Sequence, residues 1–249
     1  MIHWLFNSNA NASRLEFGGF IARVLVLFCT LVFFYQLWLL AHIAWFIKFN
    51  PASTAFMQAR LSNLQLENSS EKSSEKLKHT WVNYDNIAIH LKRAAIASED
   101  AKFLEHQGFD WEGIQTAYEK NLKKGKIVAG GSTISQQLAK NLFLSTNRTP
   151  WRKAQEVVIT VMLESVLTKR RILEIYLNMI EWGNGVFGAE AAAQHYFHKS
   201  AKSLSRQQAA KLAAIIPNPR FYDDHASTRY ERRKASTIQA RMHLVQVPK

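Results

Sequence analysis

The sequence predicts a mainly α-helical protein with one N-terminal transmembrane helix. From Trp81 onward, apolar residues recur at intervals of three and four, a spacing that places them on one face of an α-helix. Segments that alternate apolar and polar residues are scarce, and only residues 126–130 would fit a short strand. A long apolar run without a formal charge, residues 24–47, precedes the helical pattern. Together these observations favour helices over sheets throughout the chain.

The uncharged run is long enough to cross a membrane. As a helix, residues 24–47 would extend about 36 Å, whereas the hydrocarbon core of a bilayer is about 30 Å thick. Trp38 and Trp45 lie toward one end of the run, where interfacial aromatic residues are common. A cleaved signal peptide has a shorter apolar region and a small-residue cleavage site, which are not found here. The sequence therefore predicts a transmembrane helix at residues 24–47. It follows an N-terminal segment, residues 1–23, and precedes a polar juxtamembrane linker, residues 48–80.

Beyond the linker, helices are predicted wherever apolar residues repeat with the helical period. Pro150, Pro217 and Pro219 mark the ends of such segments, because proline lacks the amide hydrogen that a helix interior requires. The basic C-terminal stretch, residues 225–249, is predicted to contain a solvated helix, with contact to anionic headgroups as the alternative. The other predicted helices cover residues 87–103, 114–122, 134–144, 151–167, 172–180 and 204–216.

The composition favours a folded protein with an anionic partner. The chain has 32 Lys and Arg residues against 19 Asp and Glu residues, which gives a net charge of +13. This balance favours nucleic acid, acidic lipid headgroups or a phosphorylated substrate as partners. Hydrophobic residues make up 47% of the chain, so most of it should fold. Cys29 is the one cysteine in the sequence, which excludes an internal disulfide.

Two glutamates fall on apolar faces of predicted helices. Glu99 shares a face with Ile96 and Phe103, and Glu156 shares one with Ile159. Burial disfavours the charged form of a carboxylate, so such residues need partners or a chemical task. Alone, each would more often belong to a structural ion pair. Together on a helical scaffold, they suggest the paired-carboxylate sites that act on sugars.

A glycine turn leads into a helix between these glutamates, within the segment GKIVAGGSTISQQLAKNLFL. Gly130 and Gly131 allow a close approach of the backbone, and Thr133 with Gln136 forms a T-x-x-Q capping box. Such a helix N-terminus can hold phosphate. Gly131 stands where the lysine of a P-loop would be, so the segment is not a nucleotide-binding P-loop.

Basic residues cluster in sequence around the helix of Glu156. Several flank either the glycine turn or a candidate catalytic glutamate, and they would neutralise a diphosphate whose charge grows as a bond to it breaks. Metal ligation looks weak, because His195 and His198 form a pair without a third ligand. The cluster consists of Lys140, Arg152, Lys153, Lys169, Arg170 and Arg171.

Five ordered motifs give the chain a resemblance to a known family. The sequence contains, in order, EDAKFLEHQGFD, GGSTISQQLAKNLFL, WRKAQE, KRRILEIYLN and GNGVFGAEAAAQHYF. In this it resembles the peptidoglycan glycosyltransferases, the murein polymerases, over residues 81–224. The resemblance implies a lysozyme-like, two-lobed glycosyltransferase domain. With an N-terminal anchor and no transpeptidase domain, the chain resembles the monofunctional branch of Gram-negative bacteria.

The resemblance implies polymerisation of lipid II into glycan strands. Glu99 matches the general base, which takes the proton of the N-acetylglucosamine 4-hydroxyl of lipid II. That hydroxyl then attacks the growing chain linked to undecaprenyl diphosphate, with inversion at the sugar carbon. Glu156 matches a second carboxylate at the donor diphosphate, with a divalent cation, Mg or Mn, as the candidate cofactor. No covalently bound cofactor is expected.

The resemblance also implies further site residues. His106 is expected to orient the base or a sugar, and Asp100 to support the local helix through hydrogen bonds. Glu174, Tyr176 and Asn178 fall in the fourth motif, where structural and substrate roles are equally open. The residues implied in substrate binding are Phe103, His106, Ser132, Gln136, Gln137, Lys140, Arg152, Lys169 and Arg171.

The resemblance implies a single-pass protein of the bacterial inner membrane. Its catalytic domain would lie in the periplasm, and residues 1–23 would lie in the cytoplasm. The expected partners are lipid II, the lipid-linked glycan chain, the membrane and proteins of cell-wall synthesis or division, but not nucleic acid. Two alternatives remain. One is a membrane-bound lytic enzyme that cleaves peptidoglycan on a lysozyme-like fold. The other is a non-enzymatic, membrane-tethered scaffold.

Overall fold

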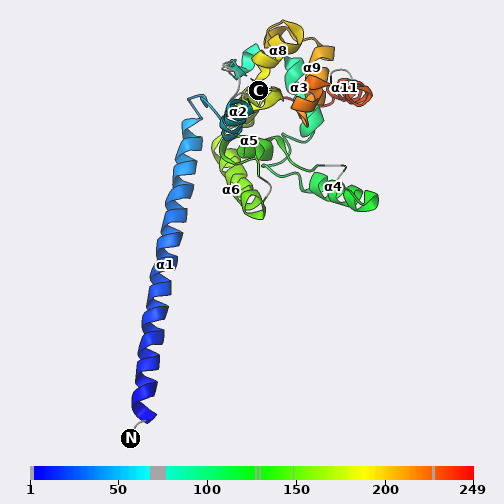
Figure 1. The fold of residues 1–249 in the computed structure, drawn as a ribbon. Helices are drawn as coiled ribbons and strands as arrows, with labels where there is room; N and C mark the ends of the chain where they lie inside the picture. The colour runs from blue at the N-terminus through cyan, green and yellow to red at the C-terminus, as the bar shows by residue number, and fades with distance from the viewer. Residues whose placement is uncertain (1–2, 68–76, 127, 129, 148, 226–227) are drawn as a thin grey trace. The chain divides into compact units, whose positions relative to one another are not determined.

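The first part of the chain is one long helix. The computed structural model describes residues 3–67, 77–126, 128, 130–147, 149–225 and 228–249, which divide into two compact units, Met1–Trp45 and Phe46–Lys249. Helix α1 (His3–Trp45) forms the first unit (Figure 1). Within the described residues, Gly19–Trp45 is the one helical segment long and apolar enough to cross a membrane, and an 18-residue stretch of it has a mean hydropathy of 2.3. Only 6% of that stretch is buried, unlike the core helix of a soluble protein. The predicted apolar helix is therefore confirmed, and it ends at Trp45.

The second unit is mainly helical, as predicted. Its short 3-10 helices are η1 (Tyr84–Asn86) and η2 (Ala201–Ser203), and its strands are β1 (Lys78–His79), β2 (Glu181–Gly183) and β3 (Val186–Phe187). Its α-helices are α2 (Ala55–Glu67), α3 (Ile89–Glu99), α4 (Trp111–Lys124), α5 (Ile134–Phe143), α6 (Pro150–Val166), α7 (Lys169–Met179), α8 (Ala189–Phe197), α9 (Arg206–Ile215), α10 (Pro219–Asp224) and α11 (Arg229–Arg241).

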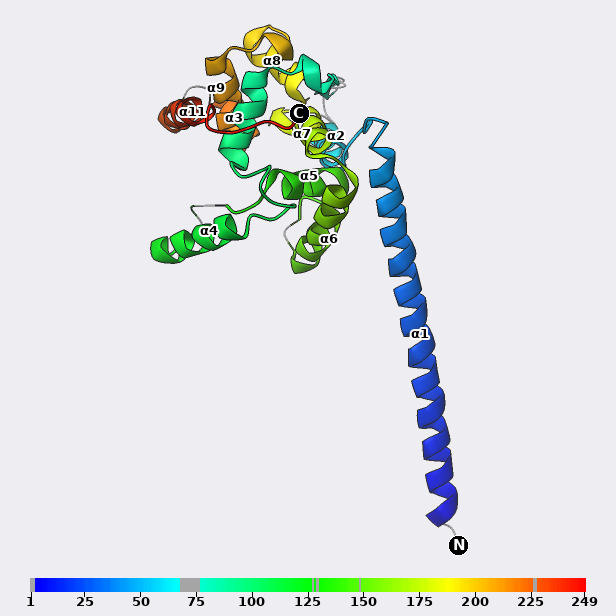
Figure 2. The ribbon, with the colours of Figure 1, turned by 180° about the vertical axis from the view of Figure 1, so that it is seen from behind.

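The helices of this unit pack in two groups. Helices α3, α9 and α11 pack against one another, and α5 packs against α2, α6 and α7. Leu91 and Leu212 are buried in the first group, and Leu138, Ile159 and Leu173 in the second. In both views α4 extends away from these groups (Figures 1 and 2). The mainly α fold is confirmed.

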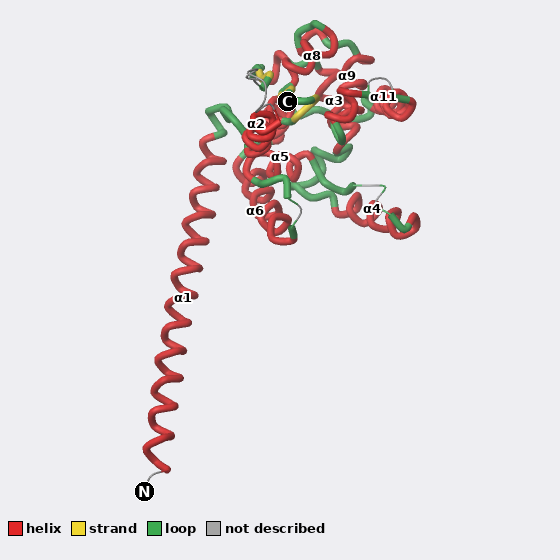
Figure 3. Tube along the Cα trace, in the orientation of Figure 1, coloured by secondary structure: helices red, strands yellow, loops and turns green. Residues whose placement is uncertain are grey.

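A small sheet, which the periodicity did not predict, packs against α8 and α10. Among the described residues it has the strand order β1-β3-β2, and its strands are the short yellow segments in Figure 3. Strand β1 runs parallel to β3, with Lys78 opposite Val186, whereas β2 and β3 form an antiparallel hairpin. The hairpin turns at Gly185, which has a φ of 68° that favours glycine. A Cβ on Gly188 would lie 2.6 Å from the carbonyl oxygen of Asn178, so this position also requires glycine.

Helix α3 ends at Glu99, four residues before the predicted end at Phe103, which corrects the prediction of one continuous helix. Asp100 leaves the helical conformation, with φ −163° and ψ 72°, because its carboxylate bonds to other segments. Phe103 is nevertheless fully buried. Glu99 therefore lies at the helix terminus, where its side chain can reach groups beyond α3.

Two further predictions concern the segments around α2 and α4. Helix α2 lies within the predicted linker, residues 48–80, of which residues 68–76 lie outside the described part of the chain. The predicted strand at 126–130 is not formed by Lys126, Val128 or Gly130, and its other two residues also lie outside the described part.

Candidate active site

Glu99 is held by side chains from three helices. Its Oε1 accepts a hydrogen bond from the Ser98 hydroxyl at 2.8 Å, and its Oε2 accepts one from Nε2 of Gln137 on α5 at 3.1 Å. Nζ of Lys234, on α11, lies 3.8 Å from Oε1. The Glu99 side chain is 10% exposed. The carboxylate is thus positioned by its neighbours, yet it keeps an open side.

Asp100 ties the end of α3 to α5. Its Oδ2 accepts a hydrogen bond from the backbone amide of Ile134, the first residue of α5, at 3.0 Å. Its Oδ1 lies 2.9 Å from Nε2 of His106, whose Nδ1 accepts from the amide of Gly108 at 3.1 Å. Asp100 therefore has the hydrogen-bonding role that was expected. His106 was expected to orient the base or a sugar; it contacts Asp100 rather than Glu99, and a contact to a sugar stays a prediction.

Helix α5 begins with the predicted capping box. The amide of Gln136 donates to the Thr133 hydroxyl at 3.2 Å, and the Gln136 side chain accepts from the amide of Thr133 at 3.0 Å. Gln136 is 3% exposed, so its side chain serves the helix start and not a substrate surface. Ser132, one residue earlier, is exposed.

Tyr176 fixes the orientation of Gln137. The Tyr176 hydroxyl donates to Oε1 of Gln137 at 2.9 Å. Burial raises the pKa of Tyr176 well above its ordinary value, and the nearby carboxylates of Glu99 and Asp100 raise it further. The phenol therefore stays protonated and donates, so the amide nitrogen of Gln137 faces Glu99. Tyr176 therefore has a structural role: it orients Gln137, which in turn contacts Glu99.

Glu156 pairs with two cations at the start of α6. Its Oε2 accepts from Arg152 at 2.8 Å, its Oε1 pairs with Lys153, and its side chain is 4% exposed. Both cations line a cavity of about 520 Å³. Nε of Arg152 is buried and has no hydrogen-bond partner among the described residues. The remaining lining residues are Phe56, Lys140, Thr146, Thr149 and Pro150.

Helix α5 connects the surroundings of the two glutamates. Gln137 contacts Glu99, and Lys140, one turn later on α5, lines the cavity together with Arg152 and Lys153. Residues three apart in a helix lie on the same side, so both groups face the same stretch of surface. The contact to Glu99 and one wall of the cavity therefore come from residues one turn apart on α5.

A buried carboxylate that the sequence reasoning missed lies between α5 and α6. Glu164 pairs with Lys169 at 2.8 Å and accepts a hydrogen bond from Ser135. Nζ of Lys169 also lies 4.5 Å from the centre of the Phe103 ring. Phe103 and Lys169 therefore form a cation–π contact. Phe103 is fully buried and does not face a substrate surface. The spacing of Glu164 eight positions after Glu156 was the signal that could have revealed it.

Arg171 binds the segment that follows α1, and this corrects its expected place at a diphosphate. Its guanidinium donates to the carbonyl oxygens of Phe46 at 2.7 Å and Phe49 at 2.9 Å, and to Oδ1 of Asn50 at 2.8 Å. It also pairs with Glu174 at 2.6 Å. All its nitrogens are engaged in structural contacts. Arg171 and Glu174 therefore hold the juxtamembrane segment on α7.

The surroundings of Glu156 do not fit an all-protein metal cage. Both of its carboxylate oxygens are occupied by cations. Within the described residues, no group of three His, Cys, Asp or Glu side chains could hold a metal ion. Lysine and arginine next to a carboxylate supply positive charge without a metal.

The chain matches known proteins along most of its length. A family model described as transglycosylase matches residues 65–243. The chain belongs to the transglycosylase family. A biosynthetic peptidoglycan transglycosylase of Methylobacillus flagellatus is 64% identical over 91% of this chain and 97% of its own length. Proteins with the same name from Laribacter hongkongensis and Chromobacterium violaceum are 59% and 60% identical, over 92% and 86% of this chain and 98% and 92% of their own lengths.

The transglycosylase match includes α11, which the sequence reasoning had assigned to a solvated tail. The match reaches residue 243, and α11 packs on α3 and α9. Lys234 was therefore missed as a neighbour of Glu99. Its local sequence, a basic run, gave no signal of this contact, because the contact depends on tertiary packing.

Proposed function

We propose that this protein polymerises lipid II into the glycan strands of peptidoglycan, with Glu99 as the general base. The observation that carries the proposal is the Glu99 carboxylate, held by Ser98 and Gln137 beside a turn of α5 that leads to a cation-lined cavity. The names of its transglycosylase relatives support the reaction class. A preorganised carboxylate beside cations suits an attack that releases a diphosphate.

The acceptor step uses Glu99. The 4-oxygen of the acceptor N-acetylglucosamine forms a bond to C1 of the donor muramic acid, the bond from C1 to the diphosphate oxygen breaks, and the proton passes to Glu99. Because the new bond forms opposite the leaving group, a donor linked α gives a β product. A positioned base contributes roughly 10²–10⁴-fold to such a step.

The departing diphosphate is proposed to bind in the cavity lined by Lys140, Arg152 and Lys153. Negative charge develops on the leaving oxygen, and cations already in place stabilise it without reorganisation. Glu156 holds Arg152 and Lys153 at the cavity, so it acts as a positioning residue. The resemblance implied a Mg or Mn ion at Glu156, but no step of the proposal uses one, because Arg152 and Lys153 already pair with both carboxylate oxygens.

The apolar helix α1 fits an enzyme whose substrates are lipids. Both the donor and the acceptor carry polyprenyl chains, so an anchor at the membrane keeps the enzyme near them. We propose that the second unit lies on the periplasmic side of the bacterial inner membrane, with residues 1–23 in the cytoplasm. Protease accessibility of spheroplasts tests this orientation.

One assay separates the proposal from a lytic enzyme. The full-length protein in detergent is incubated with lipid II, and separately with murein sacculi. Glycan chains from lipid II, without soluble muropeptides from the sacculi, support polymerisation. Muropeptides alone indicate a lytic enzyme, and no reaction with either substrate indicates a scaffold.

The same assay with a chelator tests whether the reaction depends on a divalent metal ion. Repeating the lipid II assay with EDTA, and then with added Mg, should leave the rate nearly unchanged, because side-chain cations occupy Glu156. A rate that collapses in EDTA and returns with Mg would instead support the divalent ion.

A further inference from the structure

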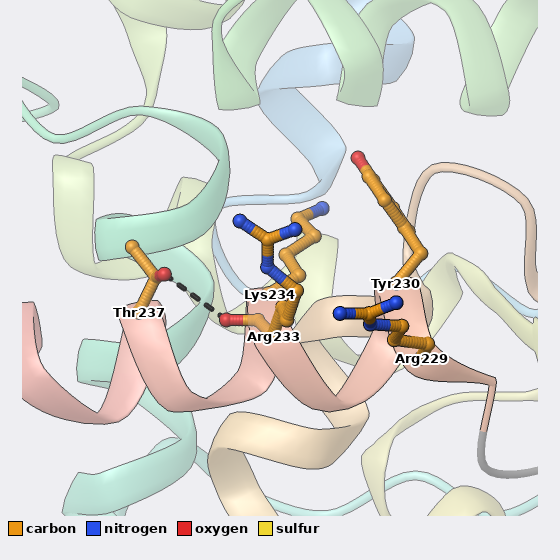
Figure 4. Close-up of a pocket in the computed structure, with 5 residues that line it drawn as sticks. All are labelled: Arg229, Tyr230, Arg233, Lys234 and Thr237. Carbon is orange, nitrogen blue, oxygen red and sulfur yellow. Dashed lines mark hydrogen bonds between the residues drawn. The ribbon is translucent and has the colours of Figure 1, made fainter.

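A second cation-lined cavity lies on α11, beside Glu99. It has a volume of about 720 Å³ and is lined by residues from a single helix (Figure 4). In Figure 4, Tyr230, Arg233 and Lys234 rise from the same side of α11. No carboxylate is among the lining residues. They are Arg229, Tyr230, Arg233, Lys234 and Thr237.

Lys234 belongs both to this cavity and to the surroundings of Glu99. Its Nζ lies 3.8 Å from Glu99 Oε1, and its side chain is 21% exposed. Burial lowers the pKa of Lys234, although the pairing with Glu99 acts in the opposite direction. A lysine held in this way borders the carboxylate on one side and the cavity on the other. Lys234 therefore links Glu99, the proposed general base, to this cavity.

Arg229 and Arg233 supply charge that the protein itself does not neutralise. Both are exposed, and neither forms an ion pair within the described residues. Arg229 lies five positions before Lys234, which is about 7.5 Å along the helix axis. Positive charge thus extends away from Glu99 along α11. An elongated ligand with its reacting end at Glu99 would place its anionic end at these arginines.

We propose that this cavity binds the diphosphate of the acceptor lipid II. The inference rests on the proposed function, because that reaction joins two lipid-linked diphosphates and the Glu156 cavity accounts for only one of them. The acceptor brings its 4-hydroxyl to Glu99, and its diphosphate lies at the far end of the disaccharide. Arginine guanidinium groups are well suited to phosphate oxygens.

The acceptor diphosphate keeps its charge and its bonds during the transfer. Arg229 and Arg233 therefore bind it equally in the ground state and in the transition state. Interactions of this kind lower KM and leave kcat nearly unchanged. The donor cavity differs, because charge develops there as the bond breaks.

The kinetic test uses the full-length protein, with preformed lipid-linked glycan as a saturating donor and lipid II as the varied acceptor. Arg233→Gln should raise the acceptor KM roughly tenfold, as expected for loss of a charge-assisted hydrogen bond. Its kcat and the KM for the donor should change less than twofold. Arg241→Gln, at an exposed position of the same helix, is the matched control and should leave both constants unchanged. An unchanged acceptor KM, or an equal rise for donor and acceptor, overturns the proposal.

A binding measurement keeps this test separate from the proposed function. The Glu99→Gln protein cannot use the proposed base, so its affinity for lipid II in detergent micelles is measured without turnover. Adding Arg233→Gln to this variant should weaken lipid II binding roughly tenfold, whereas adding Arg241→Gln should not. If wild type fails to polymerise lipid II but this difference persists, the proposed function fails and the diphosphate site stands.

Membrane phospholipids offer the same phosphate chemistry from another source. Phosphatidylglycerol is therefore added to the micelles as a competitor of lipid II. It should not displace lipid II from wild type at an equal mole fraction. Displacement from wild type, but not from Arg233→Gln, would assign the cavity to membrane headgroups and overturn the proposal.

Discussion

The side-chain nitrogen of Gln137 lies 3.1 Å from Oε2 of Glu99, and this bond joins α5 to the end of α3. The two helices belong to different packing groups of the second unit. Glu99 is therefore fixed relative to both groups at once. A carboxylate held in this way would lose little conformational freedom when a sugar hydroxyl binds, as the proposed role of a base requires.

Replacing Glu99 by Gln should abolish most of the activity and leave the fold intact. The amide has nearly the same shape but cannot accept the proton of the 4-hydroxyl. We expect the rate of lipid II polymerisation to fall roughly 10²–10⁴-fold, while circular dichroism shows that the variant remains folded at the assay temperature. Glu105→Gln, at an exposed position a few residues later, is the control and should keep the wild-type rate. Near wild-type polymerisation by Glu99→Gln would refute the assigned role.

Tyr176→Phe should reduce activity without any contact between Tyr176 and the substrate. Without the hydroxyl, Oε1 of Gln137 loses its donor, so the amide that donates to Oε2 of Glu99 is held less firmly. We expect kcat for lipid II to fall several-fold and stability to fall by about 1 kcal/mol, the usual worth of a buried hydrogen bond.

Tyr118→Phe is the control for this change, because Tyr118 is 63% exposed. It should alter neither kcat nor the unfolding midpoint. A Tyr176→Phe protein that is destabilised but has the wild-type kcat would show that Tyr176 stabilises the fold and does not position Gln137.

Glu156→Gln should impair the release of the diphosphate that is proposed to bind in the cavity lined by Lys140, Arg152 and Lys153. The amide no longer holds Arg152 and Lys153 as ion pairs, so both side chains gain freedom. We expect kcat to fall more than tenfold, because these cations stabilise charge that appears only as the diphosphate leaves. Steady-state rates with saturating lipid II measure this, and the unfolding midpoint is followed in parallel. If the loss of activity disappears at a temperature where the variant is fully folded, Glu156 serves stability alone.

The helices and caps were accessible from the sequence because they depend on neighbours in the chain. The capping box of Thr133 and Gln136 was predicted and is present. The amphipathic helices α5, α6 and α7 begin and end within a few residues of their predicted bounds. Helix α8 was missed because its repeated alanines show little contrast between faces, and the strands were missed because each has only two or three residues.

The details of the site were less accessible because they depend on tertiary contacts. Asp100 ends α3 by bonding to Ile134 and His106, so the apolar stripe from Ile96 to Phe103 was wrongly extended as one helix. Lys234 reaches Glu99 only because α11 packs on α3. The charge of Arg171 suggested a diphosphate, but its partners are backbone carbonyls of the juxtamembrane segment. In each case the residue type indicated whether the side chain would donate or accept hydrogen bonds. Which residue supplies the partner group depends on how the segments pack.

Asp223 should give the protein a pH-dependent stability that is separate from catalysis. Its carboxylate accepts hydrogen bonds from His195 at 2.7 Å, from Tyr196 at 2.9 Å and from the amide of Asn184 at 2.8 Å. Burial alone would raise the pKa of Asp223, but these hydrogen bonds outweigh it and lower the pKa below the ordinary value of 3.8. The folded protein then binds fewer protons at this group than the unfolded chain does. The resulting stabilisation is present above pH 3.8, and it is lost as the pH falls through the lower pKa of the folded state.

Asp223→Asn measures this contribution. At neutral pH the variant should be less stable than wild type by about 1–3 kcal/mol, because hydrogen bonds to a charged acceptor are lost. The difference between the two proteins should shrink as the pH falls below 3.8 and Asp223 itself becomes protonated at its lowered pKa. Thermal unfolding of both full-length proteins in detergent, followed by circular dichroism across this range, gives the difference at each pH. Asp224→Asn, at the exposed neighbouring position, is the control. A constant difference between wild type and Asp223→Asn from neutral to acidic pH would mean that packing, and not the charge of Asp223, holds α10 against the hairpin.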